Sequence, residues 1–336
     1  EKLRREGLPQ STGNRPEKRQ NTNPMLTPFV FTAATSQIGY VATPAGAILG
    51  QEALALAAAP TGSRFAAAMS DKSIKIFDAK TRMSLATFQG HTFQPRAIAW
   101  SPKGDKIASG SENAEIRIWD VKTGASKSIK GTHLRSINAL FFNAKGTLLL
   151  STSDDDTSKV WDLASTKKPV AIIYGKGINI YGTRWDKSGS RILAGTLAQG
   201  FLLYSPKTYT VVKALGGHPG YGVNDVDVND LGTRAATAGR DGAVGIWDLK
   251  TKQRIAYLRG HTDWVMRVKF DPTGAFVASS ATDGTVRIWN VRALKLAVEI
   301  PDQSYTGSPL AWVAGGNMLI TQGDDNYIRI FKFGKQ

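Results

Sequence analysis

The sequence predicts an all-β fold built from seven copies of one antiparallel unit. In residues 260–290, short runs of alternating apolar and polar residues are interrupted by Asp, Pro and Gly. Alternation with period 2 that breaks in this way is typical of short strands joined by tight turns. An aromatic residue also recurs in the same register, at steps of 42, 42, 43, 43, 42 and 42 residues. These aromatic positions are Phe77, Trp119, Trp161, Tyr204, Trp247, Trp289 and Phe331.

Three copies have a Gly-His pair near the start, as in Gly260-His261, and most copies end in Trp-Asp or a close variant, as in Trp247-Asp248. Repeats of about 40–45 residues with this pattern are the signature of propeller blades. The chain therefore resembles the WD-repeat β-propeller family over roughly residues 38–336. The resemblance implies a single seven-bladed β-propeller of four-stranded antiparallel blades.

The two ends of the chain predict how the ring closes. Phe331 lies five residues before the end, so the last blade lacks an outer strand of its own. In a closed propeller an N-terminal strand takes that place and removes the exposed edge. Residues 39–43 are the first candidate for this strand, and residues 29–33 are the alternative. We expect a basic, polar N-terminal arm over residues 1–37 and the propeller over residues 38–336.

Composition narrows the class of protein. The chain has 336 residues, of which 41% are hydrophobic, so it can bury a large core. It has no cysteine, no Asn-x-Ser/Thr sequon and no apolar run of about 18 residues. These absences exclude disulfides and thiol chemistry, argue against a membrane span and favour an intracellular protein of undetermined compartment. The net charge of +16 predicts a polyanionic neighbour.

The four histidines lie 28 or 29 residues before the Trp of their blade. The resemblance implies that each packs beside that Trp and shares a buried hydrogen-bond network with a strand Ser or Thr and a turn Asp. Blade two carries Asn113 at the turn, which predicts a weaker bond to His91. The matching sets are His91, Ser109, Asn113 and Trp119; His133, Ser151, Asp155 and Trp161; His218, Thr237, Asp241 and Trp247; and His261, Ser279, Asp283 and Trp289. Since no His or Cys is left for acid–base or nucleophilic work, we expect no catalytic, metal or cofactor site.

One rim of the ring, here called the top rim, is built in the family from the segments that enter each first strand and from the turns that hold the Asp. Aromatic residues, Met and Arg are the residue types that anchor protein interfaces. Trp264, Tyr181 and Arg96 also fit the alternative that they pack between blades. The predicted protein-binding rim consists of Arg96, Tyr181, Arg240, Trp264 and Met266.

The opposite rim, here called the bottom rim, is predicted to be positive and the top rim more acidic. Residues 163–215 hold eight basic residues and one acidic residue, Asp186. The lysine-bearing turns of the bottom rim either dock on phosphates in a salt-dependent manner or are ordinary solvated hairpins. The predicted basic face consists of Lys167, Lys168, Lys187 and Lys207.

Two functions follow from these features. The first is a non-catalytic interaction scaffold, a structural subunit of a larger protein or ribonucleoprotein assembly. The alternative is an RNA- or ribosome-associated subunit that docks on phosphates through the basic bottom face. Neither requires a small-molecule substrate. The fold alone does not decide between them.

Overall fold

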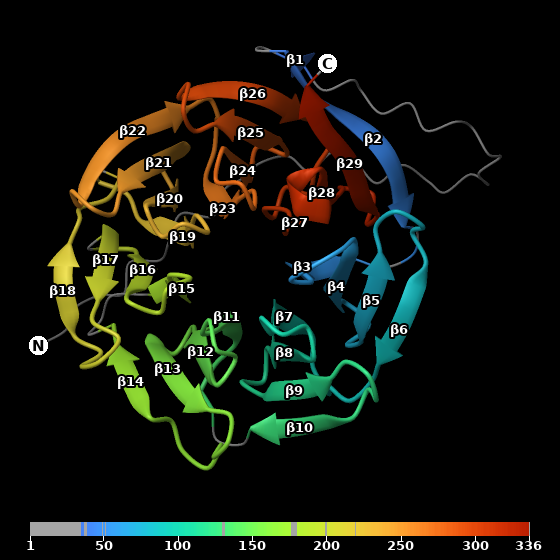
Figure 1. The fold of residues 1–336 in the computed structure, drawn as a ribbon, viewed down its shortest axis with the longest axis vertical. Coiled ribbons are helices and arrows are strands. Elements are labelled where there is room, and N and C mark those ends of the chain that lie inside the picture. The colour runs from blue at the N-terminus through green and yellow to red at the C-terminus, as the bar shows by residue number, and fades with distance from the viewer. Residues whose placement is uncertain are drawn as a thin grey trace, which may run out of the picture. The chain divides into compact units, whose positions relative to one another are not determined.

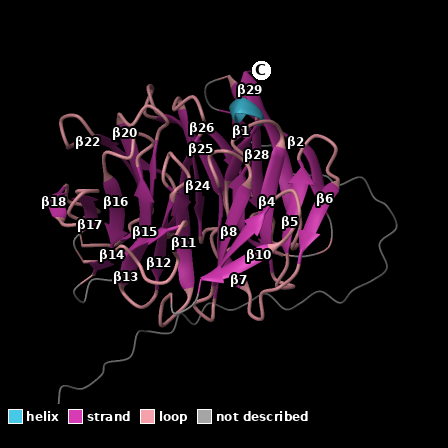
Figure 2. Cartoon of the chain, turned by 60° about the horizontal axis from the view of Figure 1, so that its bottom comes forward, coloured by secondary structure: helices cyan, strands magenta, loops and turns pink. Residues whose placement is uncertain are grey.

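The computed structural model describes residues 35–36, 39–48, 50, 52–129, 132–175, 180–198, 200–218 and 220–335. Seven antiparallel sheets of these residues surround a central axis (Figure 1). Within each sheet the strands lie side by side, in order from the central axis to the outer edge of the ring (Figure 1). The sheets stand between the two rims (Figure 2). The predicted seven-bladed propeller of four-stranded blades is confirmed.

Blades one to six each use four consecutive strands, here called a to d from the axis outward. Blades one to three contain β3 (Ala53–Ala58), β4 (Arg64–Met69), β5 (Ile74–Asp78), β6 (Ser84–Phe88), β7 (Pro95–Trp100), β8 (Lys106–Ser111), β9 (Ile116–Asp120), β10 (Ser126–Ile129), β11 (Ile137–Phe142), β12 (Leu148–Ser153), β13 (Thr157–Asp162) and β14 (Ala171–Tyr174). Blades four to six contain β15 (Ile180–Trp185), β16 (Ile192–Thr196), β17 (Gly200–Tyr204), β18 (Val211–Ala214), β19 (Val223–Val228), β20 (Arg234–Gly239), β21 (Ala243–Asp248), β22 (Gln253–Arg259), β23 (Val265–Phe270), β24 (Phe276–Ala281), β25 (Val286–Asn290) and β26 (Lys295–Ile300).

Blade seven combines the two ends of the propeller sequence. Its strands are β27 (Ala311–Val313), β28 (Met318–Gln322), β29 (Ile328–Lys335) and β2 (Tyr40–Ile48), with the short 3-10 helix η1 (Ala314–Gly316) between β27 and β28. A further short strand, β1 (Thr35–Ser36), pairs with β26 and makes the sheet of blade six five-stranded.

The middle strands of a blade are the most buried, because the sheets of the neighbouring blades pack against both of their faces. The outermost strand is more exposed. All six residues of β24 are buried, and β20 is buried except at its first residue. A strand covered on both faces has no polar face, which explains the Ala-rich and apolar sequences of the b strands. The hydrophobic clusters lie between blades, as where Ala236 of β20 packs with Val268 of β23. By contrast, all four residues of β18 are exposed.

Strand β2 closes the ring by pairing antiparallel with β29, from Tyr40 opposite Lys335 to Ile48 opposite Ile328. The Tyr40 ring stacks on Phe333 at 5.7 Å between ring centroids and meets the edge of Phe276 at 4.8 Å. The closing strand predicted at residues 39–43 is confirmed, and it continues to Ile48. The alternative at residues 29–33 lies outside the described residues, and the boundary at residues 37–38 stays a prediction.

The closure predicts different outcomes for two shortened chains. We expect the chain that begins at Thr35 to fold into the same ring. The chain that begins at Gly50 lacks β2, so β29 has an unpaired edge and Phe333 and Phe276 are no longer covered by the ring of Tyr40. It should aggregate and lose its cooperative thermal transition, as measured by circular dichroism and light scattering. A soluble chain beginning at Gly50 that still melts cooperatively would contradict the role given to β2.

Candidate interaction sites

A β-bulge at the top of the first strand positions one residue of the top rim in each of six blades. The pairing of strands a and b skips one residue there, for example between Ile180 and Gly182. A bulged residue has no partner opposite it, so its side chain is re-aimed away from the sheet. The skipped residues are Leu54, Arg96, Asn138, Tyr181, Asn224 and Met266. Three of the five predicted rim residues therefore occupy the same structural position.

Four of the predicted rim residues lie in one cluster over blades four to six. The guanidinium of Arg240 lies 5.1 Å from the Tyr181 ring centroid and 4.6 Å from that of Trp264. Its Nε donates to Asn224 Oδ1 at 2.8 Å, and Asn224 Nδ2 donates to the backbone oxygen of Val265 at 2.9 Å. Asn224 Nδ2 also lies 3.4 Å from Met266 Sδ. Asn224, which the repeat register also places on this rim, occupies the bulge position of blade five.

Within this top-rim cluster, defined as Tyr181, Asn224, Arg240, Trp264 and Met266, the indole of Trp264 is 44% exposed. A cation held between two aromatic rings is attracted by both, which keeps the guanidinium and the rings in fixed positions. Arg96 is not part of the cluster. Its Nε and Nη2 donate to Glu112 Oε1 at 2.8 and 2.6 Å, within blade two.

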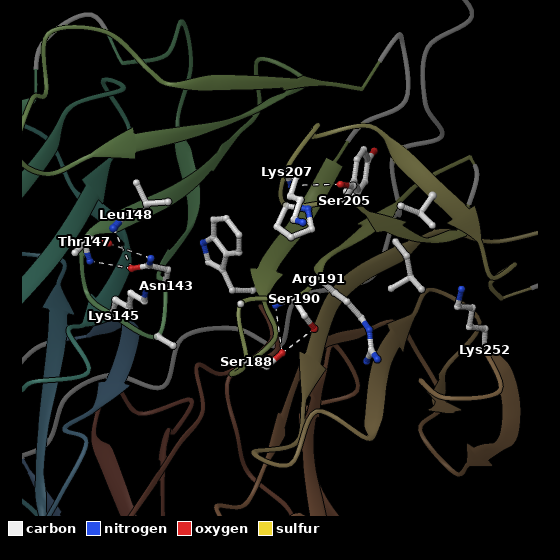
Figure 3. Close-up of a pocket in the computed structure, with 17 residues that line it drawn as sticks. Asn143, Lys145, Thr147, Leu148, Ser188, Ser190, Arg191, Ser205, Lys207 and Lys252 are labelled. Carbon is white, nitrogen blue, oxygen red and sulfur yellow. Dashed lines mark hydrogen bonds between the residues drawn. The ribbon is translucent and has the colours of Figure 1, made fainter.

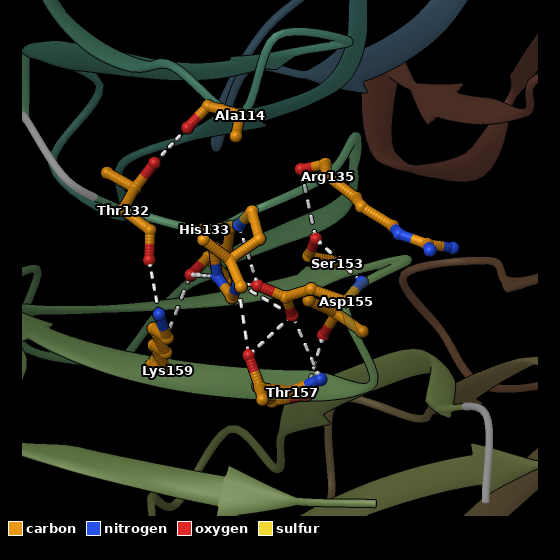
Figure 4. A network of polar contacts seen from close by, with 12 residues as sticks. Ala114, Thr132, His133, Arg135, Ser153, Asp155, Thr157 and Lys159 are labelled. Carbon is orange, nitrogen blue, oxygen red and sulfur yellow. Dashed lines mark hydrogen bonds and ion pairs between the residues drawn. The ribbon is translucent and has the colours of Figure 1, made fainter. Parts of the chain in front are cut away.

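The polar network of blade three is drawn in Figure 4. His133 Nδ1 lies 2.9 Å from Asp155 Oδ2, and Nε2 lies 2.7 Å from Ser151 Oγ. Trp161 Nε1 donates to the same Ser151 oxygen at 2.9 Å. Because the Asp155 carboxylate can only accept, Nδ1–H of the neutral ring donates to it, and Nε2 then accepts from the Ser151 hydroxyl. A neutral histidine thus satisfies every polar atom of the chain from Trp161 to Asp155.

Blades five and six repeat this arrangement. His218 lies 2.6 Å from Asp241 and 3.0 Å from Thr237, while His261 lies 2.9 Å from Asp283 and 2.7 Å from Ser279. The indoles of Trp247 and Trp289 donate to the same hydroxyls at 2.9 and 2.8 Å.

Blade two differs from the sequence-based expectation. Asn113 donates to Thr92 Oγ1 and does not contact His91. The partner of His91 Nδ1 is Glu115 Oε2 at 3.2 Å, and its Nε2 lies 2.6 Å from Ser109 Oγ, which Trp119 also contacts. The longer side chain of Glu115 reaches the ring from two residues further along the chain. The assignment of Asn113 to this network was therefore wrong.

Burial lowers the pKa of His91 and of His133 to about 4, although the nearby carboxylate raises each of them. It also lowers the pKa of His218 and His261. An unfolded histidine takes up its proton near pH 6.5. Between pH 6.5 and 4 the unfolded chain therefore binds more protons, and the free energy of unfolding falls as the pH drops through that window.

The predicted basic face does not form one patch. Lys167 and Lys168 are exposed on the turn between β13 and β14, whereas Lys187 forms an ion pair with Asp230 of the next blade. Lys207 lines a groove at the bottom rim between blades three and four (Figure 3). Carboxylates also cap bottom turns, since Asp120 and Asp248 accept hydrogen bonds from backbone N–H groups there. The bottom rim is therefore of mixed sign, not uniformly positive.

The central channel contains a charged layer that sequence reasoning missed. Arg184 pairs with Asp227, and Lys269 Nζ lies 3.8 Å from Asp227 Oδ1. Arg184 and Lys269 also approach the Phe141 ring at 4.5 and 5.7 Å. Burial lowers the pKa of Lys269, and the charge of Arg184 adds to that shift. Their spacing of 43 and 42 residues was the available signal, since it equals the repeat.

Among the residues that the structure describes, no group of three or more His, Asp or Glu side chains is arranged to hold a metal ion. In the same part of the chain, no helix has the length and apolar character that crossing a membrane requires.

The blade-two network predicts unequal effects of two substitutions. Glu115→Gln removes the charge that accepts from His91 and that pairs with Arg117 Nε at 2.9 Å. We expect it to lower the free energy of unfolding by about 1–3 kcal/mol in chemical denaturation. Asn113→Ala, two residues away on the same turn, is the matched control and should cost less. An equal or larger loss for Asn113→Ala would contradict the assignment of Glu115.

Comparison with known proteins agrees with this geometry. The family model described as "WD domain, G-beta repeat" matches residues 82–120, 126–162, 209–248 and 252–290. The chain is similar to pre-mRNA-processing factor 19 of Mus musculus, at 37% identity over 93 residues that make up 27% of this chain and 18% of that protein. It is similar to protein transport protein SEC13 of Chaetomium thermophilum, at 36% identity over 112 residues, or 30% and 36% of the two chains. It is also similar to the probable coatomer subunit beta' of Schizosaccharomyces pombe, at 33% identity over 120 residues, or 34% and 14%.

The matched segments thus span only 14% to 36% of these relatives' own lengths. Their agreement with the seven four-stranded blades concerns the repeat and the fold. With four repeats recognised and the closed ring in place, the chain belongs to the WD-repeat β-propeller family.

Proposed function

We propose that the protein is a non-catalytic scaffold, a structural subunit of a larger assembly, and that it binds a protein partner through the top-rim cluster. The observation that carries this proposal is the Arg240 guanidinium held between the rings of Tyr181 and Trp264. Trp, Tyr and Arg dominate the binding energy of protein interfaces, and here they are assembled before any partner arrives. Fixing the side chains in advance lowers the entropy lost on binding.

The relatives support the same class of function. One is named a coatomer subunit, another a protein transport protein and a third a pre-mRNA-processing factor. Each histidine is held by a carboxylate and a hydroxyl within its own blade, so its ring nitrogens are already occupied. A scaffold role uses the rims and leaves these networks intact.

The proposal predicts a loss of binding without a loss of stability. Trp264→Ala should weaken capture of the partner by about 2 kcal/mol or more, since the indole contributes area and holds Arg240. Its thermal transition should stay close to that of the unchanged chain because the side chain is 44% exposed. The measurement is affinity capture from native extract, with quantified recovery of the associated proteins.

Leu231→Ala is the matched control because Leu231 is an exposed apolar residue in the turn between β19 and β20 on the opposite rim. It should leave recovery unchanged. If Trp264→Ala lowers the melting temperature strongly, or recovers the same proteins in the same amounts, the top-rim cluster is not the binding site.

A second candidate is association with RNA or a ribonucleoprotein through the bottom rim. It is favoured by Lys167 and Lys168, which are exposed, adjacent and in no ion pair with another described residue. Such lysines neutralise phosphates without reading sequence, and the bound counterions they release make the affinity salt-dependent. This role is compatible with a scaffold.

Reversing both charges tests this candidate. Lys167→Glu combined with Lys168→Glu should weaken binding to single-stranded RNA and reduce the slope of log affinity against log salt by roughly 0.7 for each phosphate that is no longer neutralised. Lys103→Glu combined with Lys122→Glu changes the charge equally on the bottom turns of blade two. Equal effects of the two pairs would indicate general attraction to the net charge and would remove the specific role of blade three.

A further inference from the structure

The groove on the bottom rim between blades three and four has a volume of 810 Å³ (Figure 3). Its floor is apolar, with Leu148, Leu203 and Val212 among the lining side chains. Val212, from the outer strand of blade four, is 57% exposed. The edges of the groove carry four cations from four different turns, of blades three, four and five. These are Lys145, Arg191, Lys207 and Lys252.

The groove is distinguished by its charge. Among the described residues, no Asp or Glu lines it, whereas four other cavities of the ring each include at least one carboxylate. The cause is local. Where blades two and five end strand c with Asp120 and Asp248, blade four has Ser205, whose hydroxyl accepts from Lys207 N at 3.3 Å and Thr208 N at 3.2 Å. The Ser205 hydroxyl thus caps this turn of blade four as Asp does in the other two blades, but it carries no negative charge.

Asp186 is the acidic residue nearest in sequence to the groove lining, and its oxygens are already engaged. Oδ1 accepts from the backbone N–H groups of Ser190 at 2.8 Å and Arg191 at 3.1 Å, and Oδ2 accepts from the Ser188 hydroxyl at 2.9 Å. Its charge is therefore directed into the turn between β15 and β16.

The groove also borders a buried donor that has no acceptor. Trp185 lines both the groove and the central channel, is 8% exposed, and its Nε1 makes no hydrogen bond to a described residue. An unpaired buried N–H costs free energy that an acceptor in the groove would recover. A carbonyl or carboxylate oxygen bound there would supply that acceptor.

The geometry points to a binding site for an acidic peptide segment of a partner protein, with one aliphatic side chain on the apolar floor and carboxylates facing the four cations. Charge complementarity selects an anionic occupant. The floor selects peptide over RNA, because its two aromatic side chains, Trp185 and Tyr204, are 8% and 5% exposed and present no open ring face. Single-stranded RNA is held by bases stacked on exposed aromatic rings.

Fluorescence anisotropy with the full chain tests the site. The probes are a labelled Glu-Asp-Asp-Leu-Asp-Glu-Asp peptide, the same peptide with Gly in place of Leu, and a labelled uridine heptamer. We expect the Leu peptide to bind about tenfold more tightly than the Gly peptide, since the Gly peptide has no aliphatic side chain to bury. Arg191→Glu and Lys207→Glu should each weaken the Leu peptide about tenfold, and Trp185→Phe, which removes the Nε1 donor together with part of the indole, about fivefold.

Two matched controls keep the outcome specific. Trp100→Phe removes an equally unpaired buried Nε1 at the equivalent position of blade two, which lines the central channel and not the groove. Lys103→Glu with Lys122→Glu changes the net charge elsewhere on the bottom rim. Both should leave peptide affinity within about twofold. Trp264→Ala should also leave it unchanged, so failure of the groove and failure of the top-rim cluster give different results.

Four results would overturn the proposal. They are equal binding of the Leu and Gly peptides, tighter binding of the uridine heptamer than of the Leu peptide, equal losses in the groove variants and their controls, and no peptide binding up to ~1 mM.

Discussion

The pairing of β2 with β29 is the contact on which the rest of the ring depends, because it joins segments nearly 300 residues apart. Blades one to six form from consecutive strands and need no such contact. Both faces of blade seven pack against neighbouring blades. Phe331 and Phe333 pack with blade six, and Ile328 and Ile330 pack with blade one. A blade with a missing outer strand would leave those clusters and a sheet edge open to water.

Each turn Asp of the repeats has a partner, but the partner differs from blade to blade. Blades three, five and six use His, blade one pairs Asp71 with Lys75 at 3.3 Å, and blade seven pairs Asp325 with Arg329 at 2.9 Å. Blade four has no acid at this turn, and its fully buried Phe201 contacts the Trp247 ring of blade five at 5.5 Å. The physical requirement is that buried polar atoms are satisfied or absent, and several residue types meet it.

The sequence could predict the features that depend on register within one repeat, but not those that depend on contacts between blades. The aromatic period of 42 or 43 residues determined the number of blades, and the same register placed Tyr181, Arg240 and Trp264 on the top rim. Contacts between blades were not accessible in this way, because register within one repeat does not say which side chain a neighbour presents. The repeat spacing of 43 residues places Lys187 and Asp230, like Arg184 and Asp227, at the same level of neighbouring blades, but it does not say that the ion pairs form. Glu115 was missed for a different reason. It lies two residues after the expected turn position, and its longer side chain reaches His91 from there.

Blade four connects the two candidate sites. It lacks the His, the turn Asp and the final Asp, so its sequence is free of the constraints that fix the other blades. Ser205 in place of the final Asp leaves the bottom groove without a carboxylate, while the bulge residue Tyr181 supplies one of the rings around Arg240 at the top. A blade that packs through Phe201 and Leu202 without a polar network keeps the ring closed and still presents different chemistry at its two ends.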